Sequence, residues 1–151
     1  MFLSENEFKS VIRNTPLISI DLIIENYQGQ ILLGQRINKP AQGDWFVPGG
    51  RILKDETFSK AFIRLTQSEL GLGVKITDAD FIGPFEHFYK NNYLGDDFST
   101  HYVVLGYHLK LDIDIKKLPQ QQHASYKWFN KPELLNADDV NYHTKLYFLN
   151  K

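Results

Sequence analysis

The chain has no cysteine among its 151 residues, which excludes disulfides and thiolate metal sites. No apolar run approaches the roughly 20 residues that a membrane-spanning helix needs. The first residues, MFLSENEFK, are too polar and acidic for a signal peptide. The formal net charge is −1 and no run of like charges occurs, so the basic face of a nucleic-acid-binding protein is missing. We therefore expect a cytoplasmic protein with neither membrane nor nucleic-acid partners.

What the chain does contain is typical of a globular domain. Hydrophobic residues make up 42% of it and aromatic residues 14%. A chain of this length buries roughly 70% of its unfolded surface, enough for a substantial core. No internal repeat, low-complexity tract or linker interrupts the sequence. We predict one domain over residues 1–151.

Two helices are predicted from their ends. Ser4 and Glu7 have capping-box spacing, which predicts a helix from about 4 to 13. A second helix is predicted over 57–70, and Gly71 ends it. Its apolar residues recur at the spacing of one helical face, which predicts a core stripe of Phe58, Ala61, Phe62 and Leu65.

The strands are predicted from runs rich in β-branched and aromatic residues. They cover 17–26, 30–36, 45–48, 81–90, 101–111 and 125–130. The turn at 27–29 joins the first two strands as a hairpin. Further helices are predicted after the cap Asn130 and within 141–150. This mixed order predicts a single α+β domain.

Residues 50–72 carry the most specific motif, GRILKDETFSKAFIRLTQSELGL. The motif resembles the Nudix box of hydrolases that act on nucleoside diphosphates linked to another group. The residues at the box spacings are Gly50, Glu56, Arg64, Glu69, Gly71 and Leu72. The box has glutamate where this chain has Leu65 and Ser68, and an aliphatic residue where it has Thr66. The resemblance implies a mixed sheet between helices, with the box as a loop–helix–loop.

Two glutamates of the box are absent from this chain. Their absence suggests that the number of bound metal ions and the bond that is cleaved differ from those of hydrolases with the full box. Several segments outside the box resemble the branch of the Nudix family that hydrolyses GDP-mannose. They are TPLISIDLIIEN, GQR at 34–36, PAQGDWFVPGGR at 40–51, THYVVLGY at 100–107, QH at 122–123 and YFL near the C-terminus. In that branch water attacks the anomeric carbon of the sugar, and the products are GDP and mannose. A homodimer is expected from the family.

The resemblance implies a magnesium ion bound by a carbonyl of Gly49-Gly50, by Glu69, by Gln122 and by substrate phosphate. Such an oxygen-only set suits a hard cation, and two glycines let the backbone approach a ligand closely. An ordinary turn and a surface glutamate are the alternatives. Glu56 and Arg64 are predicted to form an ion pair that fixes the loop presenting Glu69.

Breaking a glycosyl–phosphate bond places negative charge on the departing diphosphate and positive charge on the sugar. Arg36 and Arg51 are the candidates for stabilising the diphosphate, and Tyr102 is a candidate hydrogen-bond donor to it. Asp21 lies in a predicted strand among isoleucine and leucine, and the resemblance places it beside the sugar. Solvated arginines, a packed tyrosine and a structurally paired aspartate are the alternatives for these residues.

His123 is the candidate general base, because histidine titrates near neutrality and the similar branch has Gln-His at this point. His87 is a second candidate that would assist or orient. The leading interpretation is magnesium-dependent hydrolysis of GDP-mannose, with GDP-glucose also open. A pyrophosphohydrolase of another nucleotide sugar and a catalytically idle nucleotide-sugar sensor are the alternatives.

Overall fold

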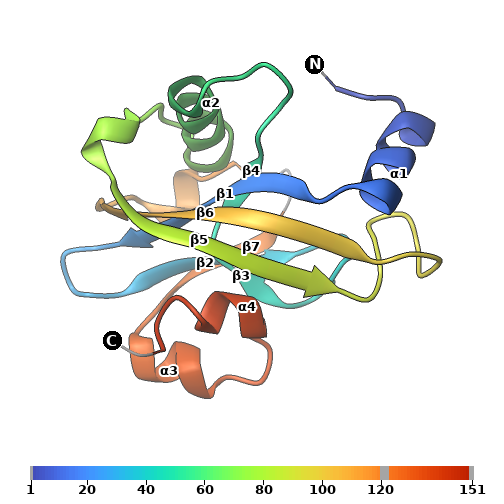
Figure 1. Cartoon of the computed structure of the whole chain (residues 1–151). Helices are drawn as coiled ribbons and strands as arrows, with labels where there is room; N and C mark the ends of the chain where they lie inside the picture. The colour runs from blue at the N-terminus through green and yellow to red at the C-terminus, as the bar shows by residue number, and fades with distance from the viewer. Residues whose placement is uncertain (1, 120–122, 150–151) are drawn as a thin grey trace.

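The computed structural model describes residues 2–119 and 123–149, the second range without the side chains of His123 and Ala124. Its centre is a seven-stranded mixed sheet in which the main strands follow the order β3-β2-β1-β6-β5 (Figure 1). Strand β1 (Leu17–Glu25) runs parallel to β6 (Thr100–Lys110), whereas the other pairings are antiparallel. The remaining strands are β2 (Ile31–Arg36), β3 (Trp45–Phe46), β4 (Gly49–Arg51), β5 (Asp80–Tyr89) and β7 (His123–Phe129).

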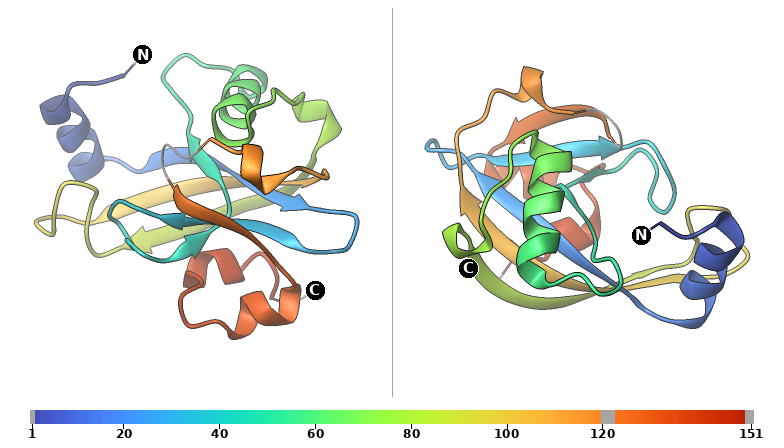
Figure 2. Two further views of the ribbon diagram at one scale, coloured as in Figure 1. Left: turned by 180° about the vertical axis from the view of Figure 1, so that it is seen from behind. Right: turned by 90° about the horizontal axis from the view of Figure 1, so that it is seen from above.

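Helices lie on both faces of the sheet. Helix α2 (Phe58–Leu70) covers one face, while α3 (Lys131–Asn136) and α4 (Tyr142–Lys145) cover the other (Figure 1). Helix α1 (Glu5–Asn14) precedes β1 and lies beyond the end of the sheet (Figure 2). Two 3₁₀ turns, η1 (Ile76–Asp78) and η2 (Ile115–Lys117), complete the described elements. The expected α+β architecture, a mixed sheet between helices, is confirmed.

Strand β1 supplies both halves of the core because alternate side chains point to opposite faces of a sheet. Ile20, Leu22 and Ile24 pack under α2, whereas Ile23 packs with residues of α3 and with Tyr147 after α4. Burying each large aliphatic side chain contributes roughly 1.5–3 kcal/mol. This two-sided burial fixes the strand in the middle of the sheet, where its Asp21 can face a site.

The predicted features that begin α1 and end α2 are confirmed, but one residue of the predicted core stripe is exposed. Ser4 and Glu7 form the capping box of α1, and α2 ends at Gly71, which has a φ of 77°. Phe58 is 57% exposed, so its predicted core position was wrong. It is the first residue of α2, and the buried face begins at Ala61 and continues to Leu70.

The predicted hairpin of the first two strands holds only at its turn. Strands β1 and β2 pair at Glu25 and Ile31 and then separate. Residues Ser19–Asp21 of β1 pair with β4 instead, and β2 pairs with β7. Gly49 and Gly50 are therefore strand residues rather than the loop after a strand. No helix in the described part of the chain is long and apolar enough to cross a membrane.

Candidate active site

One cavity of about 280 Å³ gathers most of the predicted site residues. The strands build it, because alternation turns Ser19 and Asp21 of β1 toward the same side as Tyr102 of β6. His87 of β5 is the cross-strand partner of Tyr102. The predicted residues that line it are Asp21, Arg36, Gly49, Gly50, Arg51, His87 and Tyr102.

Two arginines from different strands face this cavity. Arg36 ends β2 and its Nε donates to the carbonyl of Asn38 at 3.0 Å. Arg51 ends β4, and its guanidinium lies 4.6 Å from the ring centroid of Phe8. Burial lowers the pKa of Arg51 and raises that of Tyr102, while the positive charges of both arginines act to lower the pKa of Tyr102. The part of the cavity that Arg36, Arg51 and Tyr102 line is therefore suited to binding an anion.

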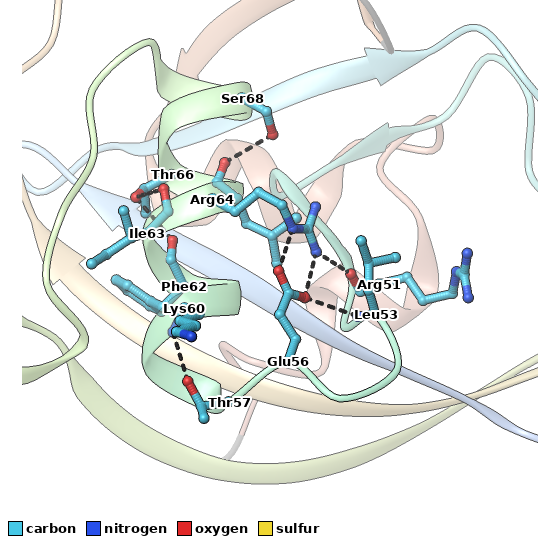
Figure 3. A network of polar contacts seen from close by, with 11 residues as sticks. Arg51, Leu53, Glu56, Thr57, Lys60, Phe62, Ile63, Arg64, Thr66 and Ser68 are labelled. Atoms are coloured by element: carbon cyan, nitrogen blue, oxygen red, sulfur yellow. Dashed lines mark hydrogen bonds and ion pairs between the residues drawn. The ribbon is translucent and has the colours of Figure 1, made fainter. Parts of the chain in front are cut away.

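The loop before α2 is fixed by an ion pair, as predicted. Arg64 contacts Glu56 through Nε at 2.6 Å and Nη2 at 3.0 Å, and Nη2 also donates to the Arg51 carbonyl at 2.8 Å. Glu56 accepts in addition from the backbone of Leu53. Figure 3 shows the Arg51 side chain pointing away from this pair. The ion pair therefore holds the Arg51 backbone and leaves its guanidinium for the cavity.

Glu69 lies behind the cavity wall rather than in the lining. Its side chain is on α2, the residue is only 3% exposed, and its Oε1 accepts from the Gly49 amide at 3.4 Å. The alternative of a surface glutamate is thus wrong. A Cβ on Gly49 would lie 2.3 Å from the carbonyl oxygen of Ile20, and one on Gly50 would lie 2.5 Å from a methyl of Leu65. The backbone contact leaves room only for glycine at position 49, whereas a Cβ at position 50 would require the Leu65 side chain to move.

The oxygen atoms of Glu69 and of the Gly49-Gly50 backbone are suited to binding a single hard cation. The Glu69 carboxylate and the backbone of Gly49-Gly50 offer oxygen ligands, the type that magnesium prefers. Within residues 2–119 and 123–149, apart from the side chains of His123 and Ala124, no group of three or more His, Asp or Glu residues could hold a metal. Leu65 is buried against Ile20 and Leu22 where the box has a glutamate. The oxygen donors that the structure describes near Gly49-Gly50 are therefore few.

Asp21 lines the cavity beside Gly49, its partner in the β1–β4 pairing. Burial raises its pKa to about 7, the hydrogen bond from Tyr147 and the charge of Arg36 act to lower it, and the charge of Glu69 raises it further. The Tyr147 hydroxyl donates to Asp21 Oδ2 at 2.5 Å. The alternative of a paired carboxylate is therefore confirmed. Asp21 also lines the cavity, and its place beside a sugar stays a prediction.

His87 is 5% exposed, and its ring stacks on that of His143 at 4.5 Å. Burial, with a smaller contribution from His143, lowers the pKa of His87 to about 3. The ring is therefore neutral near pH 7 and is a weak base. Sequence reasoning missed His143 and Tyr147, and it also missed Tyr89, which lines the cavity. Their positions depend on how α4 packs against β5, for which the sequence carries no local signal.

The predicted Gln-His pair is described only in part. Gln122 lies outside the described residues, so its place as a metal ligand stays a prediction. His123 begins β7, and its backbone pairs with that of Arg36 at a point where the register of the two strands shifts. The described fold thus brings the His123 backbone to the arginine end of β2.

Comparisons with known proteins agree with this fold. The family profile of the NUDIX domain matches residues 15–149. The low-salt glycan biosynthesis protein Agl8 of Haloferax volcanii is 38% identical over 130 residues, spanning 86% of this chain and 81% of its own. An RNA pyrophosphohydrolase of Orientia tsutsugamushi is 26% identical over 151 residues, spanning 86% and 84%. The MutT protein structure from Methanosarcina mazei Go1 shares the fold with a TM-score of 0.69 at 19% identity, over 89% of this chain and 92% of its own. The chain belongs to the Nudix hydrolase family.

Proposed function

We propose that this chain hydrolyses GDP-mannose to GDP and mannose with the help of a magnesium ion, and that water attacks the anomeric carbon. The observation that carries the proposal is that Arg36, Arg51, Tyr102 and Asp21 line one cavity, with Tyr102 close enough to both arginines to feel their charges. Cations and a hydroxyl suit a diphosphate, and a carboxylate suits a sugar that becomes positive. A substrate that joins a diphosphate to a sugar matches both groups of side chains.

The cavity accommodates part of this substrate. At about 280 Å³ it is close to the lower limit of ordinary small-molecule pockets, so it suits the diphosphate and sugar better than a whole nucleotide sugar. Phe8 and Tyr93 lie at the same cavity, with ring centroids 5.8 Å apart. These two rings are the proposed platform for the base, because aromatic side chains stack on nucleobases.

Glu69, a carbonyl of Gly49-Gly50 and Gln122 would hold the magnesium ion. When bound, the ion would supply positive charge for the departing diphosphate. Arg36 of β2 and Arg51 of β4 would neutralise the charge on the diphosphate oxygens as well. Because GDP with its charge neutralised is a good leaving group, a protein side chain need not protonate it.

His123 is the proposed base that removes a proton from water. His87 suits that role less well, because its lowered pKa of about 3 leaves little affinity for a proton. We assign His87 to orienting the groups around Asp21 and the sugar. Asp21 would stabilise the positive charge that develops on the sugar when the bond to phosphate breaks.

The relatives support this substrate class to different degrees. Agl8, at 38% identity, is named for glycan biosynthesis, a process that uses activated sugars. The relative at 26% identity is named as an RNA pyrophosphohydrolase. Its name supports the alternative reaction, in which water attacks phosphorus. A nucleotide-sugar sensor is the third possibility, against which the retained Glu69 and the Gln-His pair count. The cytoplasmic location and the homodimer stay predictions.

The proposal is tested by incubating the chain with magnesium and either GDP-mannose or GDP-glucose, and following the products by ¹H and ³¹P NMR. GDP and a free sugar are expected. GMP and a sugar phosphate would establish the pyrophosphohydrolase, and tight binding without turnover would establish the sensor. His123→Gln serves as the matched variant, with an expected fall in kcat of roughly 10²–10⁴-fold and little change in KM.

A further inference from the structure

Tyr147 approaches Asp21 from behind the cavity. It belongs to the YFL segment that follows α4, and it is not among the cavity-lining residues. Its hydroxyl donates to Asp21 Oδ2 at 2.5 Å, across 126 positions of sequence. This distance is that of a strong bond from a hydroxyl to a carboxylate. The remaining oxygen, Oδ1, lies next to Gly49 and would be 2.6 Å from any Cβ there.

The tyrosine ring is held firmly in place. It is 3% exposed, in the same buried cluster as Ile23 and Leu134, and it meets the ring of Phe85 edge-on at 4.7 Å. The hydroxyl also lies 3.4 Å from His87 Nε2. The Tyr147 hydroxyl donates its one hydrogen to Asp21, so it can only accept a hydrogen bond from His87. The His87 ring must therefore carry its hydrogen on Nε2. The hydroxyl thus has a partner on each side.

The segment that carries Tyr147 is tied to the sheet next to the site. His143 Nε2 accepts from the backbone of Phe88 at 3.3 Å, and Asn141 donates to Asp44 Oδ2 at 2.9 Å. One contact is to β5 and the other is to the loop that precedes β3. The C-terminal segment is therefore tied to β5 and to the loop before β3, which gives the hydroxyl a defined position relative to Asp21.

We propose that Tyr147 is a positioning residue of the active site, which fixes the orientation of the Asp21 carboxylate by binding Oδ2 and directing Oδ1 toward Gly49 and the cavity. This inference rests on the proposed function, in which Asp21 faces the sugar. Tyr147 does not touch the substrate; it acts through Asp21. Its effect is expected on the transition state, where the charge opposite Asp21 develops.

Tyr147→Phe tests the proposal, because phenylalanine keeps the ring packing and removes only the hydroxyl. The expected result is a kcat on GDP-mannose that is lower by roughly 10- to 100-fold, the worth of a hydrogen bond to a charged group, with little change in KM. The control is Tyr142→Phe, at a tyrosine on α4 that is 65% exposed, and its kinetics should match the parent. The double variant with Asp21→Asn should be no slower than Asp21→Asn alone, because Tyr147 affects the reaction through the Asp21 carboxylate. A parent-like kcat for Tyr147→Phe, or additive losses in the double variant, would overturn the proposal.

A second readout does not depend on turnover. In the protein without substrate, a strongly hydrogen-bonded hydroxyl proton gives a downfield ¹H resonance. This resonance should disappear in both Tyr147→Phe and Asp21→Asn, and it should remain in Tyr142→Phe. Its persistence in Tyr147→Phe would overturn the assignment. If the parent protein turns over no GDP-mannose, the proposed function fails, while this resonance still decides whether Tyr147 holds Asp21.

Discussion

Arg64 binds Glu56 through two nitrogens, with Nε at 2.6 Å and Nη2 at 3.0 Å, and Nη2 also holds the Arg51 carbonyl at 2.8 Å. The Glu56 side chain is 14% exposed and the Arg64 side chain 32%. This contact joins α2 to the loop and to the strand β4 that carries Gly49-Gly50 and Arg51. The ion pair is thus part of the support of the site rather than of its chemistry.

Glu56→Gln should lower the free energy of unfolding by roughly 1.5–3 kcal/mol, because it weakens hydrogen bonds to a charged and partly buried partner. Glu133→Gln is the control. The Lys127–Glu133 pair is also short, at 2.8 Å, but its side chains are 51% and 39% exposed, and a pair of this kind is worth less than about 1 kcal/mol. Urea unfolding measures both variants. Equal losses would show that burial of the Glu56 pair contributes nothing.

Removal of the divalent ion should abolish turnover, and Glu69→Gln should weaken the apparent affinity for magnesium. The reason is that Glu69 is the buried carboxylate next to the Gly49 amide, and the amide of glutamine is a poorer ligand than a carboxylate for a hard cation. Initial rates against magnesium concentration measure this effect, with Glu133→Gln again as control. Undiminished turnover after exhaustive chelation would show that the ion has no part in the reaction.

Arg36→Gln and Arg51→Gln should each lower kcat more than they raise KM, because the charge that they meet grows as the diphosphate departs. Arg13→Gln is a suitable control. Arg13 is an arginine of α1 with a side chain that is 54% exposed, and it does not line the cavity. Steady-state kinetics with GDP-mannose separate the two parameters. A rise in KM alone would make the cavity arginines ground-state clamps on the phosphates.

His87 should make the folded state sensitive to acid. Burial lowers its pKa from 6.5 to about 3, so between these pH values the unfolded chain binds a proton that the folded chain does not. Stability then falls as pH falls, by up to roughly 1.4 kcal/mol per pH unit for one proton. His87→Gln removes this term, while other groups, including Asp21, titrate in both proteins.

The measurement is the difference in unfolding free energy between the parent and His87→Gln from pH 7 to pH 4. The parent should lose stability relative to the variant as the solution is acidified. Parallel pH curves for the two proteins would show that the folded state accepts a proton on His87 readily, and that the ring is less buried than its 5% exposure indicates.

The sequence predicted those features that depend on local patterns or on short-range spacing. The caps at Ser4 and Gly71, the strand that carries Asp21, and the pairing of Glu56 with Arg64 all follow from residues close together in the chain. Even so, helical spacing placed Phe58 in the core, because spacing does not reveal where the sheet beneath a helix begins.

Features set by tertiary packing could not be predicted. The bond between Tyr147 and Asp21 joins residues 126 positions apart, and the separation of β1 from β2 depends on β4 and β7 taking their places. The sequence also left a surface position open for Glu69, since glutamate is usually exposed, and only its burial rules that alternative out. The gathering of Asp21, Arg36 and Tyr102 at one cavity was expected only from the family resemblance, because the parallel register of β1 and β6 that brings Asp21 and Tyr102 together is not encoded in any single segment.

The position of bond cleavage tests the central claim most directly. The chain should be incubated with magnesium and α-linked GDP-mannose in ¹⁸O-water, with the products analysed by mass spectrometry and early ¹H NMR spectra. Attack at the anomeric carbon puts the label in mannose and none in GDP, and a single displacement yields β-mannose first. Label in a phosphate product would show attack at phosphorus, and α-mannose as the first sugar would exclude the single displacement.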